Sequence, residues 1–157
     1  MSKRADVGEM LPEVALTGAD GTAVLPSAFR GKLLVLFFYP KDDTPGCTTE
    51  NKDFSALSGE FAKAGVALLG VSTDPPARHA KFTAKYGLTT PLASDAETAG
   101  LSDALGIWVE KSMYGRQYMG MERTSYLVDA DGRIARVWRK VKVKGHADEV
   151  LAAAHNL

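Results

Sequence analysis

Cysteine is nearly absent from this chain of 157 residues, which carries a single one, Cys47. One cysteine excludes a framework of internal disulfide bonds and is typical of proteins in a reducing compartment. Charge of one sign is not in excess either, because 19 basic residues balance 19 acidic ones. A balanced charge produces no field that would gather nucleic acid or an anionic membrane surface. We therefore expect neither kind of partner.

Long apolar runs are also missing. The longest unbroken one, residues 33–39, is far shorter than the roughly 20 residues that cross a bilayer. Residues 1–6 lack the apolar stretch of a signal peptide. The sequence contains no Gly-rich phosphate loop, cluster of metal ligands or dinucleotide-binding fingerprint. These absences, together with the length, predict a cytoplasmic protein with one domain over residues 1–157 and no metal or cofactor.

Apolar patterns along the chain predict strands that alternate with helices. Continuous apolar runs at residues 33–38 and 66–72 are typical of strands buried on both faces. Apolar residues spaced by three and four predict one helix from Cys47 to Ala64, ended by Gly65. The remaining predicted elements are a helix over residues 76–86, a short strand over 91–94, a short helix over 97–105, a hairpin of residues 124–129 and 133–138, and a closing helix over 147–155. This order predicts an α/β fold with a mixed central sheet flanked by helices.

Cys47 lies where a predicted strand gives way to a predicted helix. In α/β sheets, ligands gather where the carboxyl ends of strands meet the N-termini of helices. Cys47 precedes Phe54 by two helical turns, so its side chain should share the apolar face and point toward the core. If Thr44 is the N-cap and Pro45 the first helical residue, the sulfur meets free backbone N–H groups. The position thus supports a reactive thiolate about as well as a buried, inert thiol.

A helix end alone does not ionise a thiol at neutral pH. A thiol with an ordinary pKa of about 8.5 is roughly 3% ionised at pH 7, and lowering that pKa to about 6 requires about 3.4 kcal/mol. One helix N-terminus supplies about 2 kcal/mol at most. A cation must therefore lie close to the sulfur. The three histidines, His79, His146 and His155, are interpreted as surface or packing residues. Arg123, before a predicted strand, is the better candidate, although its position alone is also typical of an ordinary salt-bridge residue.

The segment over residues 39–50, YPKDDTPGCTTE, resembles the active-site segment of peroxiredoxins, in particular those of the bacterioferritin comigratory protein or peroxiredoxin Q subfamily. The resemblance continues through residues 105–108, 113–115, 119–129 and 137–146, and so extends over nearly the whole chain. It implies a thioredoxin-like fold. It also implies a thiol peroxidase for antioxidant defence, one that reduces hydrogen peroxide and organic hydroperoxides without a cofactor.

The same resemblance implies a role for three residues of the reaction centre. Cys47 matches the peroxidatic cysteine, which attacks the terminal peroxide oxygen and becomes a sulfenic acid. Thr44 matches the hydroxyl that positions the peroxide and bonds the sulfur. Arg123 matches the guanidinium that stabilises the thiolate and the transition state, which is the cation that the free energies require.

Four further residues around this centre are expected to support it. Pro40 matches the residue that shields the pocket from water, and Tyr39 and Gly46 are expected to line the same pocket. Glu50, one helical turn beyond the cysteine, matches a position from which it would orient the arginine. These roles are implied by the resemblance alone.

The chain departs from the two-cysteine members of this subfamily. A second, resolving cysteine often stands five positions after the first, where this chain has Lys52, or in the following helix near Thr83. No intramolecular disulfide can form, so the resemblance is to a one-cysteine variant whose sulfenic acid is reduced by an external thiol. Thioredoxin, glutaredoxin with glutathione, or another small thiol all remain open as donors. The resemblance favours a monomer.

Two other functions stay open from the sequence. Residues 44–47 occupy the place of a Cys-x-x-Cys motif, so a thiol-disulfide oxidoreductase is one alternative, although exchange needs the missing cysteine. The other is a non-catalytic thioredoxin-like binding or holdase module, in which Cys47 is a buried, inert thiol. Basic residues between positions 136 and 144 alternate with valines, which is more typical of a solvated strand face than of a nucleic-acid site.

Overall fold

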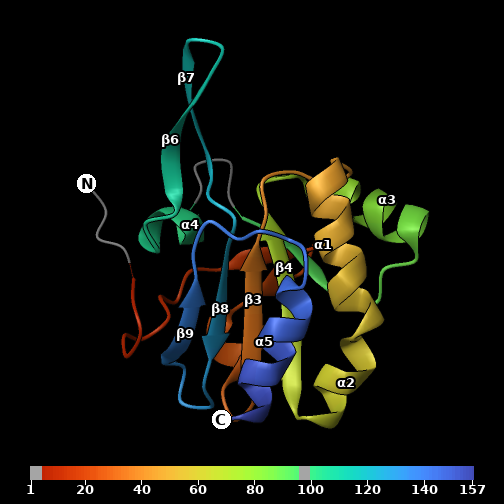
Figure 1. The fold of residues 1–157 in the computed structure, drawn as a ribbon, viewed down its shortest axis with the longest axis vertical. Helices are drawn as coiled ribbons and strands as arrows, with labels where there is room; N and C mark the ends of the chain where they lie inside the picture. The colour runs from red at the N-terminus through yellow and green to blue at the C-terminus, as the bar shows by residue number, and fades with distance from the viewer. Residues whose placement is uncertain (1–4, 96–99) are drawn as a thin grey trace.

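The computed structural model describes residues 5–95 and 100–157 (Figure 1). Its elements in chain order are β1 (Leu16–Gly18), β2 (Ala23–Val24), the 3-10 helix η1 (Pro26–Phe29), β3 (Leu33–Phe38), α1 (Pro45–Ala56), α2 (Ser58–Lys63), β4 (Val66–Ser72), α3 (Pro76–Tyr86), β5 (Leu92–Ser94), α4 (Gly100–Ala104), β6 (Trp108–Met113), β7 (Arg116–Met121), β8 (Thr124–Val128), β9 (Ile134–Trp138) and α5 (His146–His155). The helix predicted over residues 97–105 lies partly outside the described residues, and its described part is α4.

A mixed sheet forms the centre of the structure, with its strands in the order β2-β1-β5-β4-β3-β8-β9. The three strands β3, β4 and β5 are parallel to one another. The strands β8 and β9 on one side, and β1 and β2 on the other, run antiparallel to their neighbours. This arrangement confirms the predicted α/β class with a mixed sheet flanked by helices.

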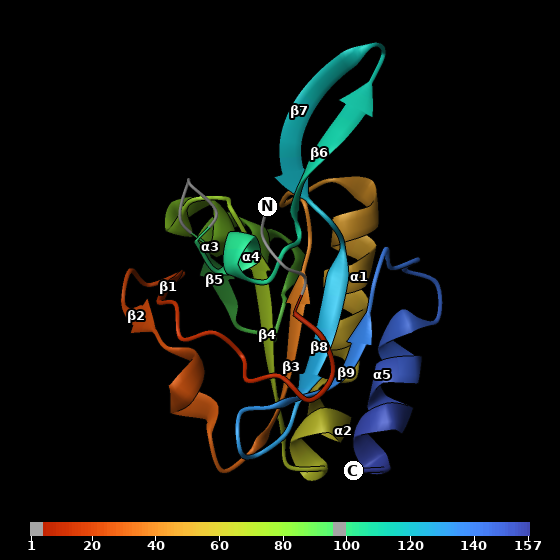
Figure 2. The same cartoon turned by 90° about the vertical axis from the view of Figure 1, so that its left-hand side faces the viewer.

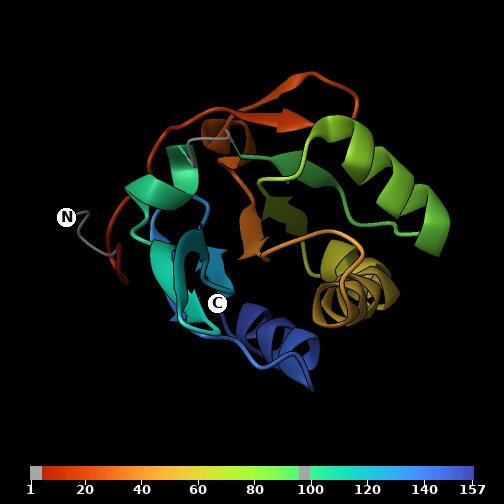
Figure 3. The same ribbon diagram turned by 90° about the horizontal axis from the view of Figure 1, so that it is seen from above.

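The alternation of side chains along β3 divides the core into two layers. Val35 and Phe37 point to the face that α1, α2, α3 and α5 cover. Leu36 and Phe38 point to the opposite face, which α4 and the N-terminal segment cover. Figure 3, seen from above, shows this division of the helices between the two sides. Each fully buried ring or aliphatic side chain contributes about 1.5–3 kcal/mol to folding, so β3 is anchored on both faces, as its apolar run predicts.

The single helix predicted from Cys47 to Ala64 is instead two helices, α1 and α2, which meet at Leu57. Leu57 has φ −97° and ψ 3°, outside the helical region. The hydroxyl of Ser58 donates to the carbonyl of Ser55 at 2.8 Å and so competes with the backbone N–H that would continue the helix. The prediction of one helix was wrong because apolar spacing does not register this local competition.

The β6–β7 hairpin, which the sequence did not predict, extends away from the body of the molecule (Figures 1 and 2). Its turn residues Tyr114 and Gly115 have φ values of 53° and 77°, the pair of positive values that a tight hairpin turn requires. The hairpin exposes Met113, Tyr114, Tyr118 and Met119. Its strands therefore lack the regular alternation of buried and exposed residues that identifies a strand from sequence.

Candidate active site

Cys47 is the third residue of α1, and its side chain is 1% exposed. The helix follows β3 after a short loop, so the sulfur lies at the carboxyl end of a central strand. Cys47 belongs to the same buried cluster as Phe37 and Phe54, whose rings stack with centroids 4.3 Å apart. The inward direction predicted from the spacing to Phe54 is therefore confirmed.

Arg123 is the cation beside this sulfur. Its Nη2 atom donates to Sγ of Cys47 at 3.2 Å. Thr124, the next residue, pairs with Phe38 at the end of β3, which brings the arginine to the edge where α1 begins. Gly46 leaves room for the guanidinium, since a Cβ atom at that position would lie 3.3 Å from Nη2. The structure thus brings together the thiol, the cation and the glycine that the sequence singled out.

Glu50 holds the other side of the guanidinium. Its Oε1 atom accepts a hydrogen bond from Nη1 of Arg123 at 2.5 Å, and its side chain is 1% exposed. Burial raises the pKa of Glu50 to about 7, although the guanidinium opposes this. Burial also opposes the charge of Arg123, but Glu50 and Cys47 outweigh it and raise the pKa of the arginine. Arg123 therefore bridges a carboxyl group and the sulfur with its two terminal nitrogens.

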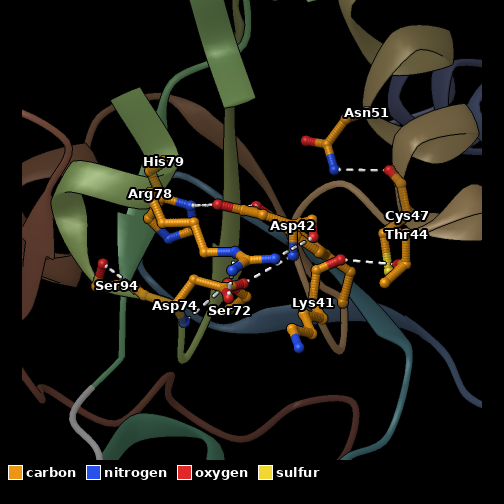
Figure 4. A network of polar contacts seen from close by, with 11 residues as sticks. Lys41, Asp42, Thr44, Cys47, Asn51, Ser72, Asp74, Arg78, His79 and Ser94 are labelled. Atoms are coloured by element: carbon orange, nitrogen blue, oxygen red, sulfur yellow. Dashed lines mark hydrogen bonds and ion pairs between the residues drawn. The ribbon is translucent and has the colours of Figure 1, made fainter. Parts of the chain in front are cut away.

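Thr44 occupies the N-cap position of α1, with extended backbone angles of −96° and 155°. Its hydroxyl does not cap the helix but donates to the carbonyl of Lys41 at 2.8 Å (Figure 4). The loop bends at Asp43, whose φ is 61°, and this bend turns the Lys41 carbonyl toward Thr44. The predicted cap position is correct, whereas the capping hydrogen bond is not formed. The hydroxyl proton is directed to Lys41, so the Thr44 oxygen is available as an acceptor.

Pro40 and Tyr39 connect β3 to this loop in different ways. Pro40 is half-buried directly after the strand. Tyr39 is fully buried, and its hydroxyl donates to Oδ1 of Asp42 at 2.5 Å. Burial and the charge of Asp42 raise the pKa of Tyr39 well above its usual value. The Tyr39 hydroxyl is therefore engaged by the loop behind the site.

A buried polar network behind the loop was not among the predicted site residues. Asp42 and His79 are both fully buried, and Nδ1 of His79 lies 2.6 Å from Oδ2 of Asp42. The backbone N–H of Asp42 donates to Oδ2 of Asp74 at 2.8 Å (Figure 4). The histidine was interpreted as a surface or packing residue, yet it binds the active-site loop. The two residues lie 37 positions apart, and no local pattern could have paired them.

Lys111, in β6, is a second basic residue that sequence reasoning missed. Its aliphatic chain lies against Gly120, where a Cβ atom would come within 3.1 Å of the lysine Cδ. Burial and the charge of Arg123 lower the pKa of Lys111, whereas Cys47 and Glu122 raise it. Lys111 therefore places a basic side chain in the middle of β6, where its pKa responds to the charges of Arg123 and Cys47.

Of the other two histidines, His146 is buried and His155 is exposed. Nε2 of His146 lies 2.8 Å from the hydroxyl of Ser125, and burial lowers the pKa of His146 to about 4. His155 is exposed at the end of α5. In the part of the chain that the structure describes, no group of three His, Cys, Asp or Glu side chains could hold a metal ion. Over the same residues, no helix has the length and apolarity needed to cross a membrane.

Comparison with known proteins connects this geometry with one group of enzymes. The AhpC/TSA family model matches residues 7–137. Peroxiredoxin Bcp of Xanthomonas campestris pv. campestris is 50% identical over 141 residues, which cover 90% of this chain and 88% of that protein. Peroxiredoxin Bcp of Bacillus subtilis is 43% identical over 146 residues, covering 93% and 92%. A solved structure of the Xanthomonas campestris bacterioferritin comigratory protein, described for its alkyl peroxide reduction activity, has a TM-score of 0.89 at 46% identity over 96% of this chain and 98% of that one.

Proposed function

The chain belongs to the AhpC/TSA family as a peroxiredoxin, a thiol-dependent peroxidase of thioredoxin-like fold, and from this premise we propose that Cys47, Arg123 and Thr44 carry its reaction. One observation supports the proposal most strongly. Nη2 of Arg123 lies 3.2 Å from the buried sulfur at the start of α1. The helix end alone is too weak to stabilise a thiolate, and the guanidinium adds the stabilisation that is missing.

In the proposed reaction Cys47 is the nucleophile. The thiolate attacks the terminal oxygen of a hydroperoxide, so that an S–O bond forms while the O–O bond breaks. The sulfur loses two electrons and becomes a sulfenic acid. The remaining peroxide oxygen leaves as an alkoxide or hydroxide and takes up a proton, which gives an alcohol or water.

Arg123 and Thr44 act on the charge and the alignment in this step. Negative charge moves from the sulfur to the leaving oxygen, and a fixed guanidinium between Glu50 and the sulfur stabilises it without rearrangement. The Thr44 oxygen accepts a hydrogen bond from the O–H of the peroxide and so sets the line of attack. Pro40 keeps water from the pocket, and Gly46 leaves room for the guanidinium.

An external thiol completes the proposed cycle, because the chain has no second cysteine. A donor thiolate attacks the sulfenic sulfur, the S–O bond breaks, hydroxide leaves and takes up a proton to become water, and a mixed disulfide forms. A second donor thiol then releases Cys47 and leaves as the oxidised donor. We propose thioredoxin, or glutaredoxin with glutathione, as this donor.

Hydrogen peroxide and organic hydroperoxides are the proposed substrates. The alkyl peroxide reduction activity described for the Xanthomonas relative supports the second class. We place the protein in antioxidant defence in the cytoplasm, as a monomer with one domain over residues 1–157. The single cysteine is typical of a reducing compartment and supports the cytoplasmic placement.

Peroxide turnover with the thioredoxin and glutaredoxin systems, run side by side, tests the proposal. The protein should consume hydrogen peroxide and cumene hydroperoxide with at least one system, and Cys47→Ser should abolish the activity. A Cys47→Ser protein that still reduced peroxide would contradict the proposal. A thiol-disulfide oxidoreductase would instead reduce insulin without peroxide turnover, and a binding module would form no sulfenic acid after stoichiometric peroxide.

A further inference from the structure

We propose that Asp74 and His79 are positioning residues of the peroxidase. Together with Asp42, they hold the peptide unit between Lys41 and Asp42 and, through it, the hydroxyl of Thr44. The inference rests on the proposed role of Thr44 as the group that receives the peroxide. It explains why a loop beside a reactive cysteine is attached to so many buried polar groups.

A single peptide unit links the network to Thr44. Its carbonyl, that of Lys41, accepts the Thr44 hydroxyl proton at 2.8 Å. Its N–H, that of Asp42, donates to Oδ2 of Asp74 at 2.8 Å. Because a peptide unit is planar and rigid, the carboxylate that holds the N–H also fixes the direction of the carbonyl. The Thr44 proton is thereby held on Lys41, and its oxygen stays free to accept a hydrogen bond from the peroxide.

Asp74 is itself fixed from three elements. Its Oδ2 atom also accepts the hydroxyl of Ser72, at the end of β4, at 2.6 Å. Its Oδ1 atom lies 3.2 Å from Nε of Arg78 on α3, and its carbonyl accepts the hydroxyl of Ser94 on β5 at 2.5 Å. Figure 4 shows these groups converging on one side of the loop. With 8% of its surface exposed, Asp74 is a rigid anchor for the peptide.

The side chain of Asp42 gives the loop a second anchor. Its Oδ1 atom accepts the hydroxyl of Tyr39 at 2.5 Å, and its Oδ2 atom accepts Nδ1–H of His79 at 2.6 Å. Its carbonyl accepts Nη2 of Arg78 at 3.2 Å. A fully buried carboxylate and histidine are costly to keep unless each finds partners. Here Asp42 binds Tyr39, the residue after β3, and His79 on α3, so its side chain fixes the loop to both parts of the fold.

The loop needs this fixation because its backbone is bent. Asp43 has φ 61°, in a region that residues with side chains seldom adopt. Its carboxylate accepts Nζ of Lys85 at 2.7 Å and the hydroxyl of Tyr86 at 2.5 Å, both on α3. Two consecutive aspartates thus attach the loop to the same helix. If the Asp42–His79 pair is lost, the backbone at Asp43 can relax out of this unfavourable conformation. The Lys41 carbonyl then turns away from Thr44.

The network contacts the loop, whereas the sulfur is held by Arg123, which Glu50 holds in turn. A positioning role therefore predicts that the network variants affect two reactions of Cys47 differently. Variants of the network should slow the reaction of Cys47 with peroxide, which uses Thr44. They should not slow alkylation of the same sulfur by iodoacetamide, which needs the thiolate and access to it but not the Thr44 hydroxyl. A residue that merely supports the fold would alter both reactions or neither.

The test measures both rate constants on the reduced full chain. His79→Leu removes the donor to Asp42 and should lower the peroxide rate by about 10- to 100-fold, with alkylation changed by less than about two-fold. Asp74→Ala, which removes the acceptor for the peptide, should act in the same way. His79→Asn keeps a nitrogen donor near the place of Nδ1 and should restore most of the peroxide rate. His155→Leu, on the exposed end of α5, is the control and should match the unmodified protein.

The outcomes separate this inference from the role proposed for Thr44. If Thr44→Val leaves the peroxide rate unchanged, the role of Thr44 itself fails. If Thr44→Val slows the peroxide reaction and the network variants do not, the present inference alone fails. Equal losses of peroxide and alkylation rates in the network variants would also overturn it. If His79→Leu does not fold, Tyr39→Phe takes its place, because it removes the other donor to Asp42 with little change in volume. Its rates with peroxide and with iodoacetamide then test the inference in the same way.

Discussion

The sulfur of Cys47 and the hydroxyl of Thr44 lie on the same turn of chain, yet different parts of the molecule hold them. The sulfur is held by a charged pair, because Arg123 bridges it to Glu50. The hydroxyl is held by a peptide whose N–H is bound to Asp74. After the roles proposed for Cys47 and Thr44, we call these the thiolate side and the peroxide side of the site. Their separate supports imply that ionisation of the nucleophile and alignment of the substrate can be disturbed independently.

The two sides also differ in what a proton does to them. On the thiolate side, burial raises the pKa of Glu50 to about 7, so the charge next to Arg123 changes near neutral pH. When Glu50 is protonated, the guanidinium has only the sulfur to neutralise and favours the thiolate more strongly. On the peroxide side, the group that contacts Thr44 is a peptide unit, which carries no titratable proton and is held by hydrogen bonds of 2.8 Å. The predictions below act on one side at a time.

Loss of Arg123 should have the largest effect. Arg123→Ala should lower the rate with peroxide by about 100- to 1,000-fold, because the sulfur and the transition state lose their fixed donor. The alkylation rate at pH 7, expressed as a fraction of its plateau at high pH, should fall as well. Arg123→Lys should recover part of the loss, since one ammonium cannot bridge Glu50 and Cys47 as a guanidinium does. An Arg123→Ala protein with the unmodified alkylation profile would contradict the prediction.

The thiolate side should also dominate the dependence of stability on pH. Because the pKa of Glu50 is raised from 4.5 to about 7 by folding, its stabilising contribution is complete below pH 4.5 and is lost as the pH rises through 7. Between pH 5 and 8, the free energy of unfolding of the unmodified protein should therefore fall relative to Glu50→Gln by about 1–3 kcal/mol. Urea unfolding at several pH values measures this difference, with Glu60→Gln on α2 as an exposed control. A difference that stays constant with pH would argue against the buried carboxyl.

Gly46→Ala should disturb the thiolate side more mildly. The added Cβ would lie 3.3 Å from Nη2 of Arg123, and the guanidinium must shift, which should slow the peroxide reaction by about 3- to 10-fold. Stability should not fall with the rate, since alanine is the better helix former by about 1 kcal/mol. Gly59→Ala in α2, where a Cβ would meet open space, is the matched control and should leave the rate unchanged. Equal effects of the two substitutions would exclude the proposed clash.

The exposed ion pair between Lys85 and Asp43 should have the smallest effect on the rate with peroxide. Lys85 binds Asp43 at 2.7 Å, but both side chains are partly exposed, at 59% and 35%. Exposed ion pairs contribute little, so Lys85→Met should change the peroxide rate by less than about two-fold. The same rate should fall far more in His79→Leu. A Lys85→Met loss as large as that of His79→Leu would show that the buried pair is not what fixes the peroxide side.

The sequence predicted the placement of Cys47 from local features, because the helix start and the spacing to Phe54 are visible in neighbouring residues. The free energy of ionisation required a cation, but Arg123 lies 76 positions away, and only the family resemblance assigned it to the sulfur. Thr44 was placed correctly as the N-cap. Its hydrogen bond to Lys41, however, depends on the bend at Asp43, which was not predicted from the sequence. The family resemblance supplied the remaining roles.

The peroxide side could not be predicted because its contacts join distant elements. His79 reaches Asp42 only because α3 packs beside the end of β3, and Asp74 reaches the loop from the end of β4. Among the elements, the buried strands were predicted because burial on both faces gives continuous apolar runs. The β6–β7 hairpin was missed because it extends into solvent and packs little of its length on the core.

The most direct test of separate support is a cycle of Arg123→Ala, His79→Leu and the double variant, with peroxide and iodoacetamide rates measured across pH. The account predicts that His79→Leu keeps the alkylation profile of the unmodified protein and that the double variant keeps that of Arg123→Ala. It also predicts that the double variant reacts with peroxide more slowly than either single variant. An alkylation profile displaced by His79→Leu as far as by Arg123→Ala would contradict it, because the two sides would then be one unit.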